Sequence, residues 1–125
     1  YNRQRINRGN ISASQLVEQF EKFYSSKDVI DRMSYDKIIP AIYDTFEKDD
    51  IFISFYETLF TKGTMNQLSH FLGIEIVEFD INEKINATKP MDLPKRNYDR
   101  CREYFSRVYT FCEREFPKTK ILWKP

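Results

Sequence analysis

The sequence predicts an α/β fold that is mainly helical and contains one buried strand of the kind found in parallel sheets. Apolar residues recur every three or four positions over most of the chain, which is the spacing of amphipathic helices. The short run Ile51–Phe55 has neither this spacing nor a strict polar–apolar alternation, as is typical of a strand covered on both faces. A chain of 125 residues is expected to form one domain.

Two helical regions are predicted before the strand. Residues 10–26 begin with the pattern of a capping box, in which Ser12 is the N-cap and Gln15 is its partner three residues later. Residues 28–48 predict a short helix and then a longer one. Pro40 is expected near the first turn of the longer helix, because proline has little effect on stability there.

The segment Ile51–Phe55 is the predicted strand. A strand buried on both faces needs neighbouring strands, and this chain supplies no other segment of that kind. We therefore expect the rest of the sheet to lie upstream of Tyr1 or on another chain. Residues 1–125 are interpreted as the C-terminal portion of a single domain, and the absence of an initiator methionine agrees with a fragment.

The second half of the chain is again predicted to be mainly helical. Gly73 has the position of a helix C-terminal stop, and Pro94 has the position of a helix start. The segments are expected in this order: a helix over 61–73, a short edge strand over 74–79, a loop over 80–94, a helix over 94–116, and a tail over 118–125 that packs back onto the body.

Composition excludes some classes of function. The chain has 20 basic and 19 acidic side chains and a formal net charge of +1. A general nucleic-acid or membrane-surface binder would carry a clear basic excess, so neither partner is expected. No apolar run is long enough to predict a membrane span.

The two cysteines, Cys101 and Cys112, are eleven residues apart on one predicted helix. A rise of about 1.5 Å per residue places them about 16 Å apart, too far for a disulfide. Two reduced thiols favour the cytoplasm. The single histidine, His70, and the lack of any Cys-x-x-Cys pattern predict no metal site.

Several motifs occur in order along the chain: Ser34-Tyr35, the run Ile51–Phe55, Tyr56-Glu57-Thr58-Leu59, Phe71-Leu72-Gly73-Ile74, and the ending "VYTFCEREFPKTKILW". Together they resemble the C-terminal half of sulfotransferases that use 3′-phosphoadenosine 5′-phosphosulfate (PAPS). The family has a P-loop-type three-layer fold, and its P-loop part is absent from this chain. The resemblance implies transfer of a sulfuryl group from PAPS, without a metal, to a hydroxyl or amine acceptor.

The same resemblance implies a nucleotide site. Tyr56 is expected beside the adenine of PAPS, and Lys84, Asn86 and Lys89 are expected near its phosphates, where ammonium and amide groups suit an anion. Without the resemblance, the alternative interpretation is that Tyr56 caps the core and that Lys89 belongs to a solvated loop. The catalytic residues are unknown and are expected upstream of Tyr1, so the 125-residue chain alone is expected to be inactive.

Two other functions remain open at the level of sequence. One is a non-catalytic helical interaction module in which Ile51–Phe55 is incidental. The other is a P-loop kinase relative that moves a phosphoryl group instead. The environment of Ile51–Phe55 distinguishes the predicted α/β fold from the helical module, because a segment that is helical, or exposed and unpaired, would contradict the family resemblance.

Overall fold

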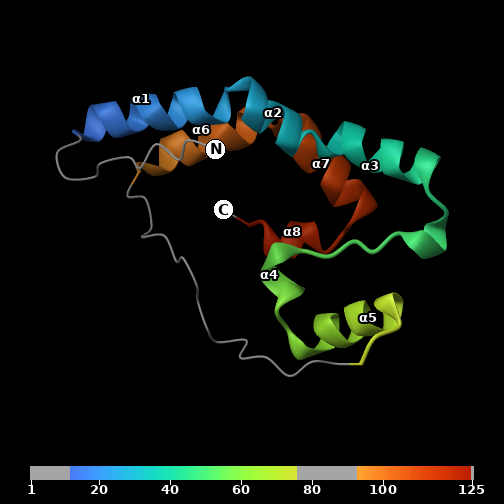
Figure 1. The fold of residues 1–125 in the computed structure, drawn as a ribbon. Coiled ribbons are helices and arrows are strands. Elements are labelled where there is room, and N and C mark those ends of the chain that lie inside the picture. The colour runs from blue at the N-terminus through green and yellow to red at the C-terminus, as the bar shows by residue number, and fades with distance from the viewer. Residues whose placement is uncertain (1–11, 76–92, 125) are drawn as a thin grey trace.

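The computed structural model describes residues 12–75 and 93–124, and these residues contain helices and irregular segments but no strand. Helices account for 75% of the part of the chain described. The predicted α/β class is therefore wrong, and the described residues form a small all-helical domain (Figure 1). Its elements are α1 (Ala13–Tyr24), α2 (Lys27–Met33), α3 (Tyr35–Thr45), η1 (Lys48–Asp50), α4 (Tyr56–Leu59), α5 (Lys62–Leu72), α6 (Lys95–Tyr104), α7 (Ser106–Glu115) and α8 (Thr119–Leu122).

The segment predicted as a buried strand is extended at both ends but pairs with no strand among the described residues. Ile51 has φ −115° and ψ 123°, and Phe55 has φ −108° and ψ 138°. Ile53 is 37% exposed, so the segment is not covered on both faces. The prediction failed because aromatic rings from elsewhere in the chain, rather than neighbouring strands, pack against Phe52 and Phe55.

Three ring contacts provide that packing. Phe55 lies edge-on to Phe116 and to Trp123, with centroid distances of 5.8 and 6.2 Å. Phe52 packs against Phe71 of α5 at 5.4 Å. The Phe55 contacts bring the start of α4 against the C-terminal end of the described chain, and the Phe52 contact joins the segment to α5. Both α4 and α5 lie away from α1 and α2 in Figure 1.

The helix starts follow local hydrogen-bonding rules. At α1 the predicted capping box is confirmed, since the Gln15 amide donates to Ser12 Oγ at 3.3 Å and the Ser12 amide donates to Gln15 Oε1 at 2.9 Å. Pro40 lies in the interior of α3, not in its first turn as predicted. Its missing N–H leaves the carbonyl group of Asp36 without the usual donor in the helix.

The predicted end of α5 at Gly73 is confirmed. Gly73 has φ 65°, the left-handed conformation that glycine adopts without the steric cost of a Cβ atom. Its amide donates to the His70 carbonyl group at 3.1 Å, and the Ile74 amide donates to that of Ser69 at 3.1 Å. The expected edge strand over 74–79 and the expected loop lie almost entirely outside the described residues.

The long helix predicted over 94–116 is interrupted at Phe105, which has φ −97° and ψ 19° and separates α6 from α7. Phe105 is buried in a cluster with Val108 and Cys112. The change of direction lets α6 pack along α1 while α7 packs along α3 (Figure 1). The tail packs back onto the body as predicted, and Trp123 contacts the same cluster.

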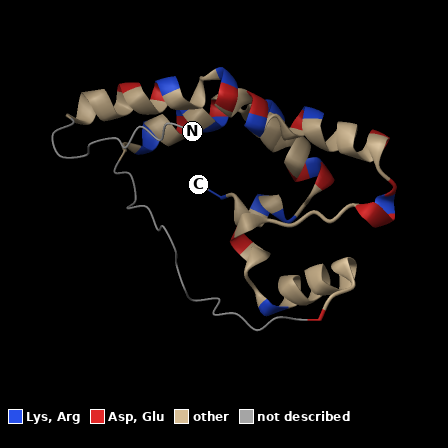
Figure 2. Ribbon diagram, viewed as in Figure 1, with Lys and Arg blue, Asp and Glu red and all other residues tan. Residues whose placement is uncertain are grey.

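Charged side chains of both signs are interspersed along the helices, whereas α5 carries almost none (Figure 2). The ion pair between Arg107 and Asp36 joins α7 to α3, and Arg107 Nε donates to Asp36 Oδ2 at 3.1 Å. The pair between Arg100 and Glu21, at 3.2 Å, joins α6 to α1. The two ion pairs therefore join the same helices that pack against each other, α3 with α7 and α1 with α6.

Candidate functional site

A cavity of about 640 Å³ lies where the start of α4, the α6–α7 pair and the residues around α8 meet. We call it the Tyr56 pocket. This volume is in the range of small-molecule sites, which are mostly apolar with a few polar groups. Its aromatic lining residues are Tyr35, Phe55, Tyr56, Tyr98, Phe105, Tyr109, Phe116 and Trp123.

Tyr56 is the first residue of α4 and is 80% exposed. Its ring lies edge-on to Phe60, with centroids 6.2 Å apart. The extended backbone of Phe55 leads directly into the helix, so Tyr56 stands where the chain changes direction at the edge of the pocket. A ring with this exposure has a face free for stacking against a planar group. Glu57 also lines the pocket.

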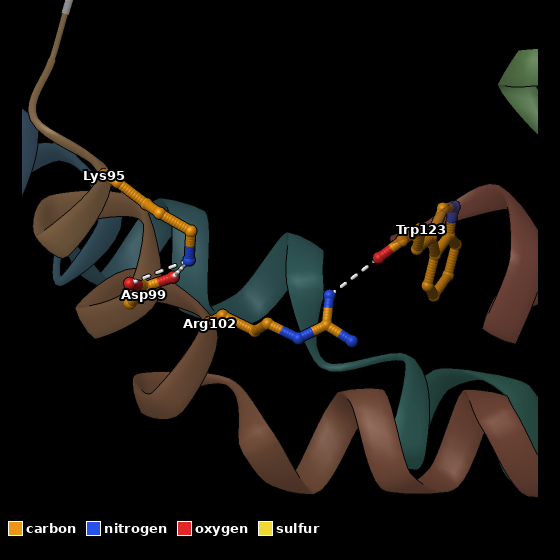
Figure 3. Close-up of polar contacts among 4 residues, drawn as sticks. All are labelled: Lys95, Asp99, Arg102 and Trp123. Carbon is orange, nitrogen blue, oxygen red and sulfur yellow. Dashed lines mark hydrogen bonds and ion pairs between the residues drawn. The ribbon is translucent and has the colours of Figure 1, made fainter. Parts of the chain in front are cut away.

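Arg102 of α6 is the best-anchored polar side chain of the pocket. Its Nη1 donates to the carbonyl oxygen of Trp123 at 2.7 Å, as Figure 3 shows. Its Nη2 donates to Glu113 Oε1 at 3.3 Å, and its guanidinium carbon lies 4.2 Å from the centroid of the Tyr109 ring. The guanidinium thus joins α6, α7 and the end of α8.

Sequence reasoning did not identify Arg102, although a signal for it exists. Arg102, Phe105 and Tyr109 have the three- and four-residue spacing of one helix face, so an arginine interrupts an otherwise apolar stripe. An arginine in that position either points to solvent or binds buried acceptors. Which of the two occurs depends on where the end of the chain returns, and local spacing does not determine that.

Asp99 and Tyr109, two other polar residues of the pocket, each contact a cationic side chain. Lys95 Nζ donates to both carboxylate oxygens of Asp99, at 2.8 and 3.1 Å (Figure 3). Burial raises the pKa of Tyr109, and the positive charge of Arg102 opposes that effect only in part, so the phenol stays protonated at neutral pH.

The two thiols, which also line the pocket, are free, and no disulfide joins them. Burial raises the pKa of Cys101 and of Cys112, and the negative charge of Asp36 raises the pKa of Cys112 further. A thiol kept protonated at neutral pH is a poor nucleophile. Neither thiol is therefore expected to act as a nucleophile at neutral pH.

Only one of the four residues predicted to hold the nucleotide falls within the described ranges. Tyr56 lies at the pocket, whereas Lys84, Asn86 and Lys89 lie outside the residues that the structure describes. Within residues 12–75 and 93–124, no group of His, Cys, Asp and Glu side chains has the arrangement of a metal site. None of the helices in those ranges combines the length and apolar character needed to cross a membrane.

Comparison of the chain with protein-family models, with curated proteins and with solved structures found no match.

Proposed function

We propose that the complete protein transfers a sulfuryl group from PAPS to a hydroxyl or amine acceptor, and that this chain contributes part of the nucleotide site. The observation that carries the proposal is the ordered series of motifs: Ser34-Tyr35, then Tyr56-Glu57-Thr58-Leu59, then Phe71-Leu72-Gly73-Ile74. The exposure of Tyr56 at the edge of a pocket supports it, because a tyrosine that stacks on adenine needs a free ring face.

In this proposal Tyr56 stacks on the adenine ring, while Lys84 and Lys89 supply positive charge to the phosphates and Asn86 donates a hydrogen bond. Sulfuryl transfer also needs a base for the acceptor proton and charge stabilisation of the moving group. We assign those parts to residues upstream of Tyr1 or on another chain. The 125-residue chain alone is then catalytically inactive, and the protein works in the cytoplasm, where free thiols stay reduced.

The test is isothermal titration calorimetry of the full gene product with 3′-phosphoadenosine 5′-phosphate and, separately, with ATP. Tighter binding of 3′-phosphoadenosine 5′-phosphate, together with sulfate transfer from PAPS, would support the proposal. Tighter binding of ATP would favour the P-loop kinase relative. Sulfate transfer by the isolated 125-residue chain would show that the catalytic groups lie within it, contrary to the assignment above.

A non-catalytic helical interaction module is the second candidate. The observation that favours it is the all-helical character of the described residues, together with the large apolar side chains that they leave exposed. Exposed apolar surface is typical of protein interaction sites. In the same titrations this module would bind neither nucleotide, so a full-length protein without nucleotide affinity would favour this function.

A further inference from the structure

The segment Thr119–Trp123 folds back over the Tyr56 pocket and is fixed at both ends. At its start, Thr119 has no exposed surface, and its hydroxyl donates to the carbonyl oxygen of Phe116 at 2.8 Å. At its other end, the carbonyl oxygen of Trp123 accepts the 2.7 Å hydrogen bond from Arg102 (Figure 3). Between these points Ile121 is 72% exposed, so the segment is held mainly through its two ends.

Trp123 is where separate parts of the molecule meet. Its ring lies edge-on to Phe55, with centroids 6.2 Å apart, and edge-on to Tyr109 at 5.9 Å. Phe55 immediately precedes Tyr56 and is the N-cap of α4. Displacing Trp123 therefore removes one wall of the pocket and one of the contacts that fix the start of α4.

Release of this end leaves no buried charge without a partner. If Trp123 moves away, the guanidinium of Arg102 keeps its contacts with Glu113 and with the ring of Tyr109. The Arg102 side chain is also 35% exposed, so water replaces the lost acceptor. Release of Trp123 exposes its carbonyl group and its indole, while Thr119 at the other end of the segment stays buried.

We propose that Thr119–Trp123 is a strap that opens and closes the Tyr56 pocket, and that the hydrogen bond from Arg102 to the Trp123 carbonyl oxygen is its latch. Arg102 is a positioning residue, because it acts on the pocket through Trp123. A hydrogen bond from a charged donor shifts a two-state population by roughly ten- to a hundredfold. This inference goes beyond the proposed sulfuryl transfer and concerns access to the pocket for any ligand.

The experiment uses the intrinsic fluorescence of the 125-residue chain, whose single tryptophan is Trp123. Arg102→Met keeps most of the side-chain length but has no donor, so the strap is expected to spend more time open. The emission maximum then moves to longer wavelength, acrylamide quenches more strongly, and the planar dye 8-anilino-1-naphthalenesulfonate binds more tightly. Arg102→Lys, which retains a donor, is expected to restore part of the parent emission.

Two controls separate the latch from general loosening of the fold. Arg100→Ala removes the 3.2 Å ion pair with Glu21 from the same helix and is expected to leave the emission of Trp123 unchanged. Glu113→Gln removes the other ionic partner of Arg102 but keeps the latch, and is also expected to resemble the parent. Far-ultraviolet circular dichroism confirms that each variant keeps its helices.

The proposal is overturned by either of two results. One is an Arg102→Met chain with helical circular dichroism and the emission of the parent. The other is an equal shift in Arg100→Ala, because the signal would then report loss of packing rather than opening of the strap. If Arg102→Met loses its helices, the choice falls to Arg102→Lys. A folded Arg102→Lys chain whose tryptophan emission and acrylamide quenching equal those of the urea-unfolded chain, despite the retained donor, refutes the latch, and values closer to those of the parent support it.

Discussion

Replacing Tyr56 with alanine is expected to separate nucleotide binding from folding. The side chain is 80% exposed, and its ring lies edge-on to that of Phe60, with centroids 6.2 Å apart. Loss of that edge-on pair changes the free energy of unfolding by about 1 kcal/mol or less. If Tyr56 stacks on adenine, its removal costs about 1–3 kcal/mol of binding free energy, which weakens binding roughly 5- to 150-fold.

The assay is calorimetric titration of the full gene product with 3′-phosphoadenosine 5′-phosphate, with urea unfolding of the same samples. Tyr56→Phe keeps the ring and is expected to lose at most about tenfold, the worth of one hydrogen bond. Tyr43→Ala removes a tyrosine that is 47% exposed on α3 and provides the matched control. Equal affinities for the parent and Tyr56→Ala, or equal losses in Tyr56→Ala and Tyr43→Ala, would refute a stacking role.

Three further predictions concern the described fold. Asp36→Asn removes the charge partner of Arg107 and is expected to lower the urea unfolding free energy by about 1 kcal/mol, and an unchanged value would contradict a stabilising pair. Gly73→Ala is expected to lower the melting temperature, because alanine is strained by about 1 kcal/mol at φ 65°. No neighbouring atom obstructs the added Cβ, so the backbone strain is the whole expected effect. An unchanged melting temperature would argue against this conformation. Cys101 and Cys112 are expected to react slowly with dithiobis(nitrobenzoate) at pH 8 until urea unfolds the chain, and a thiol that reacts at the rate of free cysteine would contradict its burial. Since the folded pKa of both thiols is raised, their contribution to stability is complete below the unfolded pKa of about 8.5 and is lost as the pH rises through the higher folded values.

Local signals in the sequence were sufficient for several parts of the fold. The capping box at Ser12 and the glycine stop at Gly73 depend on hydrogen bonds between residues three to five positions apart, so the sequence contains the information needed to predict them. The interruption at Phe105 was missed because the apolar spacing continues unbroken through 94–116. The break is set by two different packing partners, since α6 lies along α1 and α7 along α3, and spacing within one helix does not show this.

The candidate site was predictable only where one residue acts by itself. Tyr56 was predicted as a site residue because its motif is contiguous, and in the structure it lines the pocket, exposed at the start of α4. Its role in binding stays a prediction. Arg102 was missed because its acceptor is a backbone carbonyl group 21 residues later, and every residue offers such an acceptor. The position of the strap therefore follows from tertiary packing rather than from any pattern in the sequence.

The failure at Ile51–Phe55 has the same origin. A run of apolar residues specifies that its side chains avoid water, and it specifies nothing about what covers them. Backbone angles at Ile51 and Phe55 are those of a strand, so the local conformation agrees with the expectation even though the sheet does not. Phe55 meets the rings of Phe116 and Trp123, which lie more than sixty positions further along the chain. The contacts that decide between a sheet and a helical domain are thus long-range, and the strap that carries Trp123 covers the segment as well as the pocket.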